Sequence, residues 1–119
     1  MEEVPKKIEH QLAQYQELQR QAQIMIAQRQ QLELQMRESE RAIEELDKLS
    51  DDKPIYKSIG SLLIRVKSRE GIIKELKEEK ETAEVRAKTL DRQIERLRER
   101  LNTLQKDISE QLKVREELE

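Results

Sequence analysis

The chain contains the stretch Ile55-Tyr56-Lys57-Ser58-Ile59-Gly60-Ser61-Leu62-Leu63-Ile64-Arg65-Val66, which decides its fold. Two runs rich in β-branched and aliphatic residues flank a Gly-Ser pair, the pattern of a β-hairpin with a two-residue turn. Glycine in the first turn position permits the positive φ of a type II′ turn. The first run alternates Ile55, Lys57 and Ile59 with Tyr56 and Ser58. The second run places Leu62, Ile64 and Val66 on one face.

Long heptad segments lie on both sides of this hairpin. Before it, apolar or small residues recur with alternating spacings of three and four at Ile8, Tyr15, Leu18, Ala22, Met25, Leu32, Met36, Ile43 and Leu46. After it, the same spacing returns at Ile73, Leu76, Ala83, Ala87, Leu90, Ile94, Leu97, Leu101, Leu104, Ile108 and Leu118. This is the seam of a coiled coil. It predicts helices over residues 6–49 and 69–118, separated by a linker over residues 50–68.

The two seams match each other if the chain folds back at the hairpin. In an antiparallel pairing, the residue numbers of facing seam positions must add up to a constant. They do so in eight layers: Leu46 with Ile73, Ile43 with Leu76, Met36 with Ala83, Leu32 with Ala87, Met25 with Ile94, Ala22 with Leu97, Leu18 with Leu101, and Tyr15 with Leu104. A parallel dimer would need no such symmetry about the linker. The pattern therefore favours an intramolecular antiparallel coiled coil.

Composition agrees with this mainly α fold. Of the 119 residues, 42% are charged and 34% hydrophobic, without Trp, Phe or Cys, so a single domain over 1–119 has little for a central core. The absence of cysteine excludes disulfides and thiol chemistry and agrees with a reducing compartment. No window approaches the roughly 20 apolar residues of a membrane span. We expect a soluble cytoplasmic protein that uses no cofactor and has no membrane partner.

The hairpin itself predicts assembly with other chains. A two-stranded sheet alone is marginal in water, and its unpaired edges invite strands from elsewhere. We therefore expect the hairpins of several subunits to complete an inter-subunit sheet or β-barrel. The candidate oligomerisation residues are Ile55, Tyr56, Ile59, Gly60, Leu62, Ile64 and Val66.

The segment Ile55–Leu63, after the Asp-rich break at Asp51 and Asp52, resembles the linker of β-type prefoldin subunits. Glu84-Val85-Arg86 and Leu90-Asp91-Arg92-Gln93 resemble the second helix of the same family. The resemblance implies a hexamer of two α-type and four β-type subunits whose hairpins form β-barrels. It also implies a chaperone that holds non-native polypeptides without ATP and passes them to a group II chaperonin. Since α-type subunits carry two hairpins, the single hairpin here indicates the β type.

The two termini should share the end of the coiled coil away from the hairpin, and there the seam weakens. The next layers would pair Gln11 with Ile108 and Ile8 with Gln111, beside apolar residues that lack seam partners. Such an end could hold exposed hydrophobic segments of other proteins. The predicted client-binding residues are Val4, Ile8, Leu12, Ile108, Leu112, Val114 and Leu118. The alternative is an ordinary frayed coiled-coil end.

Other classes of function find little support. His10 is the single histidine and no second nitrogen or sulfur ligand stands near it, so we expect no metal site. Neither a nucleophile with a base nor a Gly-rich phosphate loop indicates an enzyme. Basic residues recur every four positions from Lys88 to Arg100, but acidic ones are interleaved and the net charge is −2, so nucleic acid is not an expected partner. A structural coiled-coil adaptor, and less so a nucleic-acid-associated coiled coil, remain alternatives.

Overall fold

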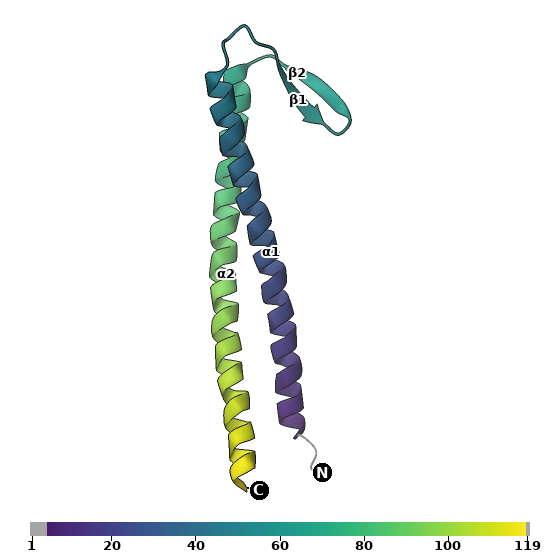
Figure 1. Ribbon diagram of the computed structural model, residues 1–119, viewed down its shortest axis with the longest axis vertical. Helices are drawn as coiled ribbons and strands as arrows, with labels where there is room; N and C mark the ends of the chain where they lie inside the picture. The colour runs from purple at the N-terminus through teal and green to yellow at the C-terminus, as the bar shows by residue number, and fades with distance from the viewer. Residues whose placement is uncertain (1–4, 119) are drawn as a thin grey trace. The chain divides into compact units, whose positions relative to one another are not determined.

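The computed structural model describes residues 5–118, of which Leu118 only in its backbone, as two long helices joined by a β-hairpin. Helix α1 spans Lys6–Lys48, strands β1 and β2 span Ile55–Ile59 and Leu62–Val66, and helix α2 spans Arg69–Leu118 (Figure 1). The predicted architecture of two helices and one antiparallel hairpin is confirmed. The first helix ends one residue earlier than the predicted range 6–49.

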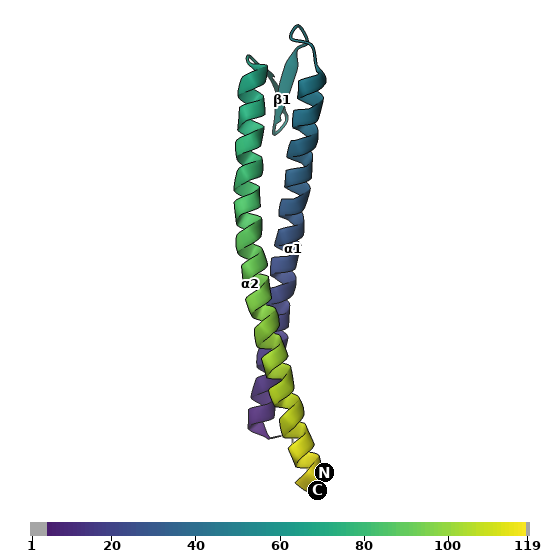
Figure 2. The same ribbon diagram turned by 90° about the vertical axis from the view of Figure 1, so that its left-hand side faces the viewer.

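Contacts along the chain fall into two units. One unit pairs the first part of α1, up to Arg29, with the part of α2 that begins at Lys88. The other unit, Gln30–Ala87, contains the end of α1, the hairpin and the start of α2. In both units the α1 and α2 segments run side by side in opposite directions, as the two views agree (Figures 1 and 2).

In the first unit the core is a line of seam residues from both helices. The buried cluster consists of Ile8, Leu18, Ala22, Leu97, Leu104 and Ile108, with Tyr15, Met25 and Leu101 packed against it. These are the positions that the heptad pattern selects, because residues three and four apart lie on one helix face. Between Met25 and Leu32, at a position outside the predicted seam residues, Arg29 links the two helices, because its Nε donates to Asp91 Oδ1 at 2.8 Å.

In the second unit the seam is narrower and more polar. Leu32, Ala83 and Ala87 are buried, and so is the hydroxyl-bearing Ser39. The layers nearest the hairpin, which include Ile43 and Leu76, are only half buried. Ala83, Ala87 and Ser39 bury less apolar surface than the leucines of the first unit, so we expect less stabilisation from their layers.

Local chemistry explains where the helices begin. The carbonyl of Pro5 accepts the N–H groups of Ile8 and Glu9 at 2.9 and 3.1 Å, which starts α1 directly after the proline. At the start of α2, Ser68 acts as the N-cap, because its Oγ accepts the Gly71 N–H at 3.0 Å. Each helix is thus fixed at its first turn by the residue before it.

Candidate functional site

The hairpin is paired in the register that the sequence predicts. Ile59 faces Leu62 across the Gly60-Ser61 turn, and the ladder continues to Ile55 opposite Val66. Gly60 has a φ of 58°. Among the described residues, it is the only one with a positive φ. A positive φ at the first turn position alone matches a type II′ turn rather than type I′.

The register sorts the hairpin side chains onto two faces. One face, the aliphatic face, carries Ile55, Lys57, Ile59, Leu62, Ile64 and Val66. The opposite face carries Tyr56 beside Arg65 and Ser58 beside Leu63. Since cross-strand partners point to the same side of a sheet, both faces present apolar side chains.

Most of these apolar side chains are exposed. Leu62 is 62% exposed and Tyr56 is 56% exposed, and Ile59 and Ile64 belong to the same group. Leu63, at 72%, is the most exposed large hydrophobic residue of the described chain, and it is not among the predicted oligomerisation residues. The alternation of the strand residues could have identified Leu63, because it places Leu63 on the same face of the hairpin as Tyr56. Large exposed apolar patches of this kind mark interaction surfaces.

Two polar ties lie at the hairpin end of the second unit, one from the hairpin to α2 and one from the start of α2 to the end of α1. The Lys57 ammonium group on the aliphatic face pairs with Glu75 of α2, and this hydrogen bond raises the pKa of Lys57 above its ordinary value. Arg69, at the start of α2, binds the end of α1 and Asp51. In Figures 1 and 2 the hairpin turn points back along the helices.

The predicted client-binding residues divide into two groups. Ile8 and Ile108 are buried members of the first unit's core, at 2% and 7% exposure, so the expectation that the seam weakens at these two positions is wrong. The half-buried Gln11 and Gln111 extend the seam beside them, which lets both isoleucines pack. By contrast Leu12, Leu112 and Val114 are exposed. Val4 and the Leu118 side chain lie outside the described residues.

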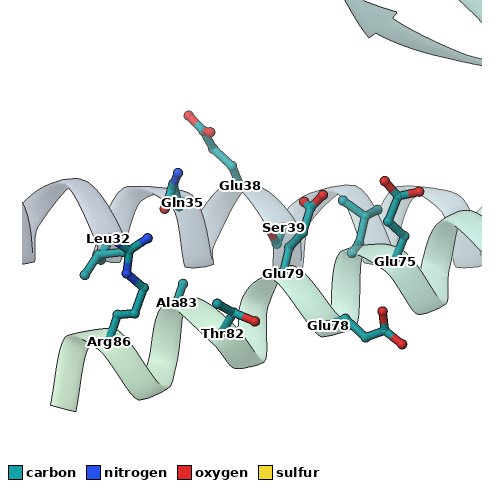
Figure 3. A pocket seen from close by; sticks show the side chains of 11 residues that line it. Leu32, Gln35, Glu38, Ser39, Glu75, Glu78, Glu79, Thr82, Ala83 and Arg86 are labelled. Carbon is teal, nitrogen blue, oxygen red and sulfur yellow. The ribbon is translucent and has the colours of Figure 1, made fainter. Parts of the chain in front are cut away.

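A groove runs between α1 and α2 in the second unit, with a volume of about 560 Å³ (Figure 3). Leu32, Leu76 and Ala83 contribute its apolar part, and Glu38, Glu75, Glu78 and Glu79 stand around it. Figure 3 shows Glu38 and Glu78 pointing away from one another. This arrangement is the solvated flank of a coiled coil, where charged side chains border the seam.

The described residues show no arrangement for metal binding, since they contain no group of three or more His, Cys, Asp or Glu side chains that could hold an ion. Among the described helices, none is long and apolar enough to span a bilayer. The geometry is that of a coiled-coil protein in which an antiparallel helix pair carries an exposed apolar hairpin.

Comparison with known proteins agrees with this class. The family model described as prefoldin subunit matches residues 9–115. The chain is 47% identical to the prefoldin subunit beta of Archaeoglobus fulgidus over 91% of this chain and 92% of that protein, and 43% identical to that of Methanothrix thermoacetophila over 92% and 91%. The crystal structure of the prefoldin beta subunit from Thermococcus strain KS-1 superposes with a TM-score of 0.81 at 34% identity, over 94% of this chain and 97% of that one. The chain belongs to the prefoldin family, as a subunit of the β type.

Proposed function

We propose that this chain is a subunit of an ATP-independent cytoplasmic chaperone that binds non-native polypeptides and delivers them to a group II chaperonin. In this proposal the assembly is a hexamer of four such chains and two α-type subunits. The observation that supports it best is the two-stranded hairpin, whose apolar side chains from Tyr56 to Ile64 are exposed in the single chain. A two-stranded hairpin is marginal on its own, and partner strands that cover its apolar side chains would stabilise it.

The aliphatic face of the hairpin is the proposed interior of an inter-subunit barrel. Its cross-strand pairs Ile59 with Leu62 and Ile55 with Val66 would pack against the same pairs of neighbouring subunits. Lys57 lies in the middle of this face, but its ammonium group reaches Glu75 on α2. The tie keeps the charge at the edge of the proposed barrel, where only the aliphatic part of the side chain would be covered.

The proposed client surface is the end of the first unit where α1 begins and α2 ends. Leu12, Leu112 and Val114 offer exposed aliphatic side chains there, while Ile8 and Ile108 hold the two helices together beneath them. Binding by exposed aliphatic groups selects unfolded chains, because folded proteins rarely present matching apolar segments.

A structural coiled-coil adaptor is the second candidate, and one observation favours it. An adaptor needs a tight seam at both ends of the coiled coil, and the burial of Ile8 and Ile108 fits that requirement. The adaptor would bind one defined partner through the hairpin and would ignore unfolded proteins.

Native mass spectrometry of the chain, alone and mixed with an α-type prefoldin subunit, separates the two candidates. The chaperone proposal expects a hexamer with four copies of this chain, and that complex should suppress aggregation of a denatured test protein without ATP. Replacing Leu12, Leu112 and Val114 together by Ser should leave the hexamer intact and weaken suppression. The matched control is the triple variant Ala13→Ser, Thr103→Ser and Ser109→Ala, which changes three exposed positions of the same unit. A discrete dimer that ignores both partner and client would instead establish the adaptor.

A further inference from the structure

The junction at the hairpin end of the second unit is closed by a single arginine. α2 begins with the Ser68 cap, which fixes the backbone of the first turn through the Gly71 N–H. A further hydrogen bond, from the Ile72 N–H to the Ser68 backbone carbonyl at 3.2 Å, completes this turn. Arg69 is therefore the first residue of α2 and has a defined backbone from which its side chain extends.

The Arg69 side chain reaches across to the end of α1. Its Nη1 donates to the Leu49 carbonyl and, at 3.4 Å, to the Leu46 carbonyl, and its Nη2 lies 3.1 Å from Asp51 Oδ1. The last carbonyls of a helix lack their usual partners within the helix, and a cation there is favourable for the helix dipole. The Leu46 carbonyl also accepts the Leu49 N–H at 3.2 Å. One guanidinium thus completes the end of α1, although it comes from α2. We call Arg69 with Leu46, Leu49 and Asp51 the Arg69 clamp.

The clamp leaves one guanidinium donor without a partner among the described residues. Arg69 Nε is buried and has no hydrogen-bond partner in the described chain, while the side chain as a whole is only 26% exposed. A buried unpaired donor is unfavourable, so the contacts to Leu46, Leu49 and Asp51 have to offset this cost. A lysine could not reproduce these contacts, because its single ammonium group lacks the planar fork of a guanidinium.

We infer that Arg69 is a positioning residue for assembly, because the clamp sets the direction in which the hairpin leaves the coiled coil. The clamp joins the end of α1, where the linker begins after Lys48, to the start of α2, where the linker ends. The Lys57–Glu75 pair ties β1 to α2 as a second anchor. This inference rests on the proposed function, in which the hairpin is the assembly surface.

Fixing the hairpin matters because both of its faces carry exposed apolar side chains. A hairpin that swings freely would offer Tyr56 and Leu63 to neighbours as readily as the aliphatic face. Holding it in one orientation before association lowers the ordering cost of binding and removes wrong pairings. The clamp would thereby favour one assembly over a mixture.

Spin-label distances test the clamp directly, since the chain has no cysteine of its own. Labels at Ser58→Cys and Lys77→Cys, both exposed and both in the second unit, report the distance from the hairpin to α2. The expected distribution is narrow in the otherwise unchanged chain, broad in Arg69→Ala and intermediate in Arg69→Lys. Arg41→Ala, which removes an exposed arginine of α1, should keep the narrow distribution. An equally narrow distribution in Arg69→Ala would overturn the inference.

Assembly provides the second readout. With an α-type subunit present, the concentration for half-assembly of Arg69→Ala should rise at least about tenfold, with Arg69→Lys in between and Arg41→Ala unchanged. Circular dichroism should show the same helix content throughout. If Arg69→Ala lost helix content, the milder variant Asp51→Asn would test the clamp instead, because it removes only the contact with Asp51. An unchanged distance distribution in Asp51→Asn would count against the clamp.

A hairpin variant separates this inference from the proposed function. Ile59→Ser with Leu62→Ser removes the central pair of the aliphatic face but keeps the clamp. If that double variant assembles as well as the unchanged chain, the hairpin is not the assembly surface and the proposed function fails. The clamp would then be judged by the distance measurement alone. Normal assembly of Arg69→Ala beside failed assembly of the double variant would refute the positioning role only.

Discussion

The ammonium group of Lys80 lies 2.8 Å from the carboxylate of Glu40. Lys80 occupies a seam position of α2, where the heptad pattern predicts an apolar side chain. The layer pattern pairs this position with Ser39, which is buried. Glu84 stands 3.9 Å from the same ammonium group. The second unit therefore contains one polar layer within its seam, and such layers lower stability while fixing the register.

Replacing Lys80 by Leu should stabilise the chain. The leucine would bury apolar surface in the seam, whereas the lost ion pair is partly exposed, at 29% for Lys80 and 52% for Glu40, and contributes little. We expect the melting temperature to rise by about 5 °C, measured by circular dichroism. Lys77→Leu, at an exposed position of the same helix, is the control and should change it little. A lower melting temperature for Lys80→Leu would show that the ion pair outweighs apolar packing.

Gln11 offers a similar test in the first unit. Its Oε1 is buried and has no hydrogen-bond partner in the described chain. Because an unpaired buried acceptor costs free energy, Gln11→Leu should raise the free energy of unfolding by about 1–2 kcal/mol. Chemical denaturation measures this, with the exposed Gln14→Leu as the control. If both variants gave equal changes, Gln11 would have to be exposed in solution.

Ile8 and Leu12 should behave differently although they lie one turn apart. Ile8 is buried in the seam, so Ile8→Ala should lower the free energy of unfolding by about 2–4 kcal/mol. Leu12 is 42% exposed, so Leu12→Ala should cost well under about 1 kcal/mol. Denaturation curves of the two variants provide the comparison. Similar losses would mean that Leu12 is also part of the packed seam.

Gly60 should tolerate substitution in an order set by its backbone. A Cβ built on Gly60 meets no atom within 4 Å, so the cost comes from the positive φ and not from crowding. Gly60→Asn should therefore be mild, while Gly60→Ala should destabilise the hairpin by about 1 kcal/mol and Gly60→Val by more. Amide hydrogen exchange in β1 and β2 reports this order. Equal protection from exchange in the unchanged chain and in the three Gly60 variants would show that the positive φ of the turn costs no stability.

The Lys57–Glu75 tie should depend on pH. Its hydrogen bond raises the Lys57 pKa above the ordinary value of 10.5. A raised lysine pKa means that the contribution is fully present below about pH 10 and is lost as the pH rises through the folded-state pKa.

Thermal melts of the unchanged chain and Glu75→Gln from pH 8 to 11.5 check this sign. The advantage of the unchanged chain should shrink towards the alkaline end of the range. Glu78→Gln, on the same helix, should show no such trend. An advantage for the unchanged chain that grew with pH would contradict the pairing.

Much of the fold follows from local sequence rules. The helix bounds follow from the heptad spacing and from the break between the two heptad segments, and the hairpin follows from Gly60 between two alternating runs. The antiparallel layers could be predicted because facing residue numbers add up to one constant. These signals are local periodicities, and a periodicity tells which face of a helix or strand is apolar without knowledge of the partner.

The tertiary structure alone decided which apolar residues are free. Periodicity could not tell that Ile8 and Ile108 stay packed beside Gln11, because that depends on how two distant helix ends fill the space between them. Nor could it show Arg69 bound to the Leu49 carbonyl 20 residues away, since a long polar side chain on a helix surface has many possible partners. The sequence by itself determined the elements and their register, whereas packing and hydrogen bonding between distant segments determined which surfaces remain for binding.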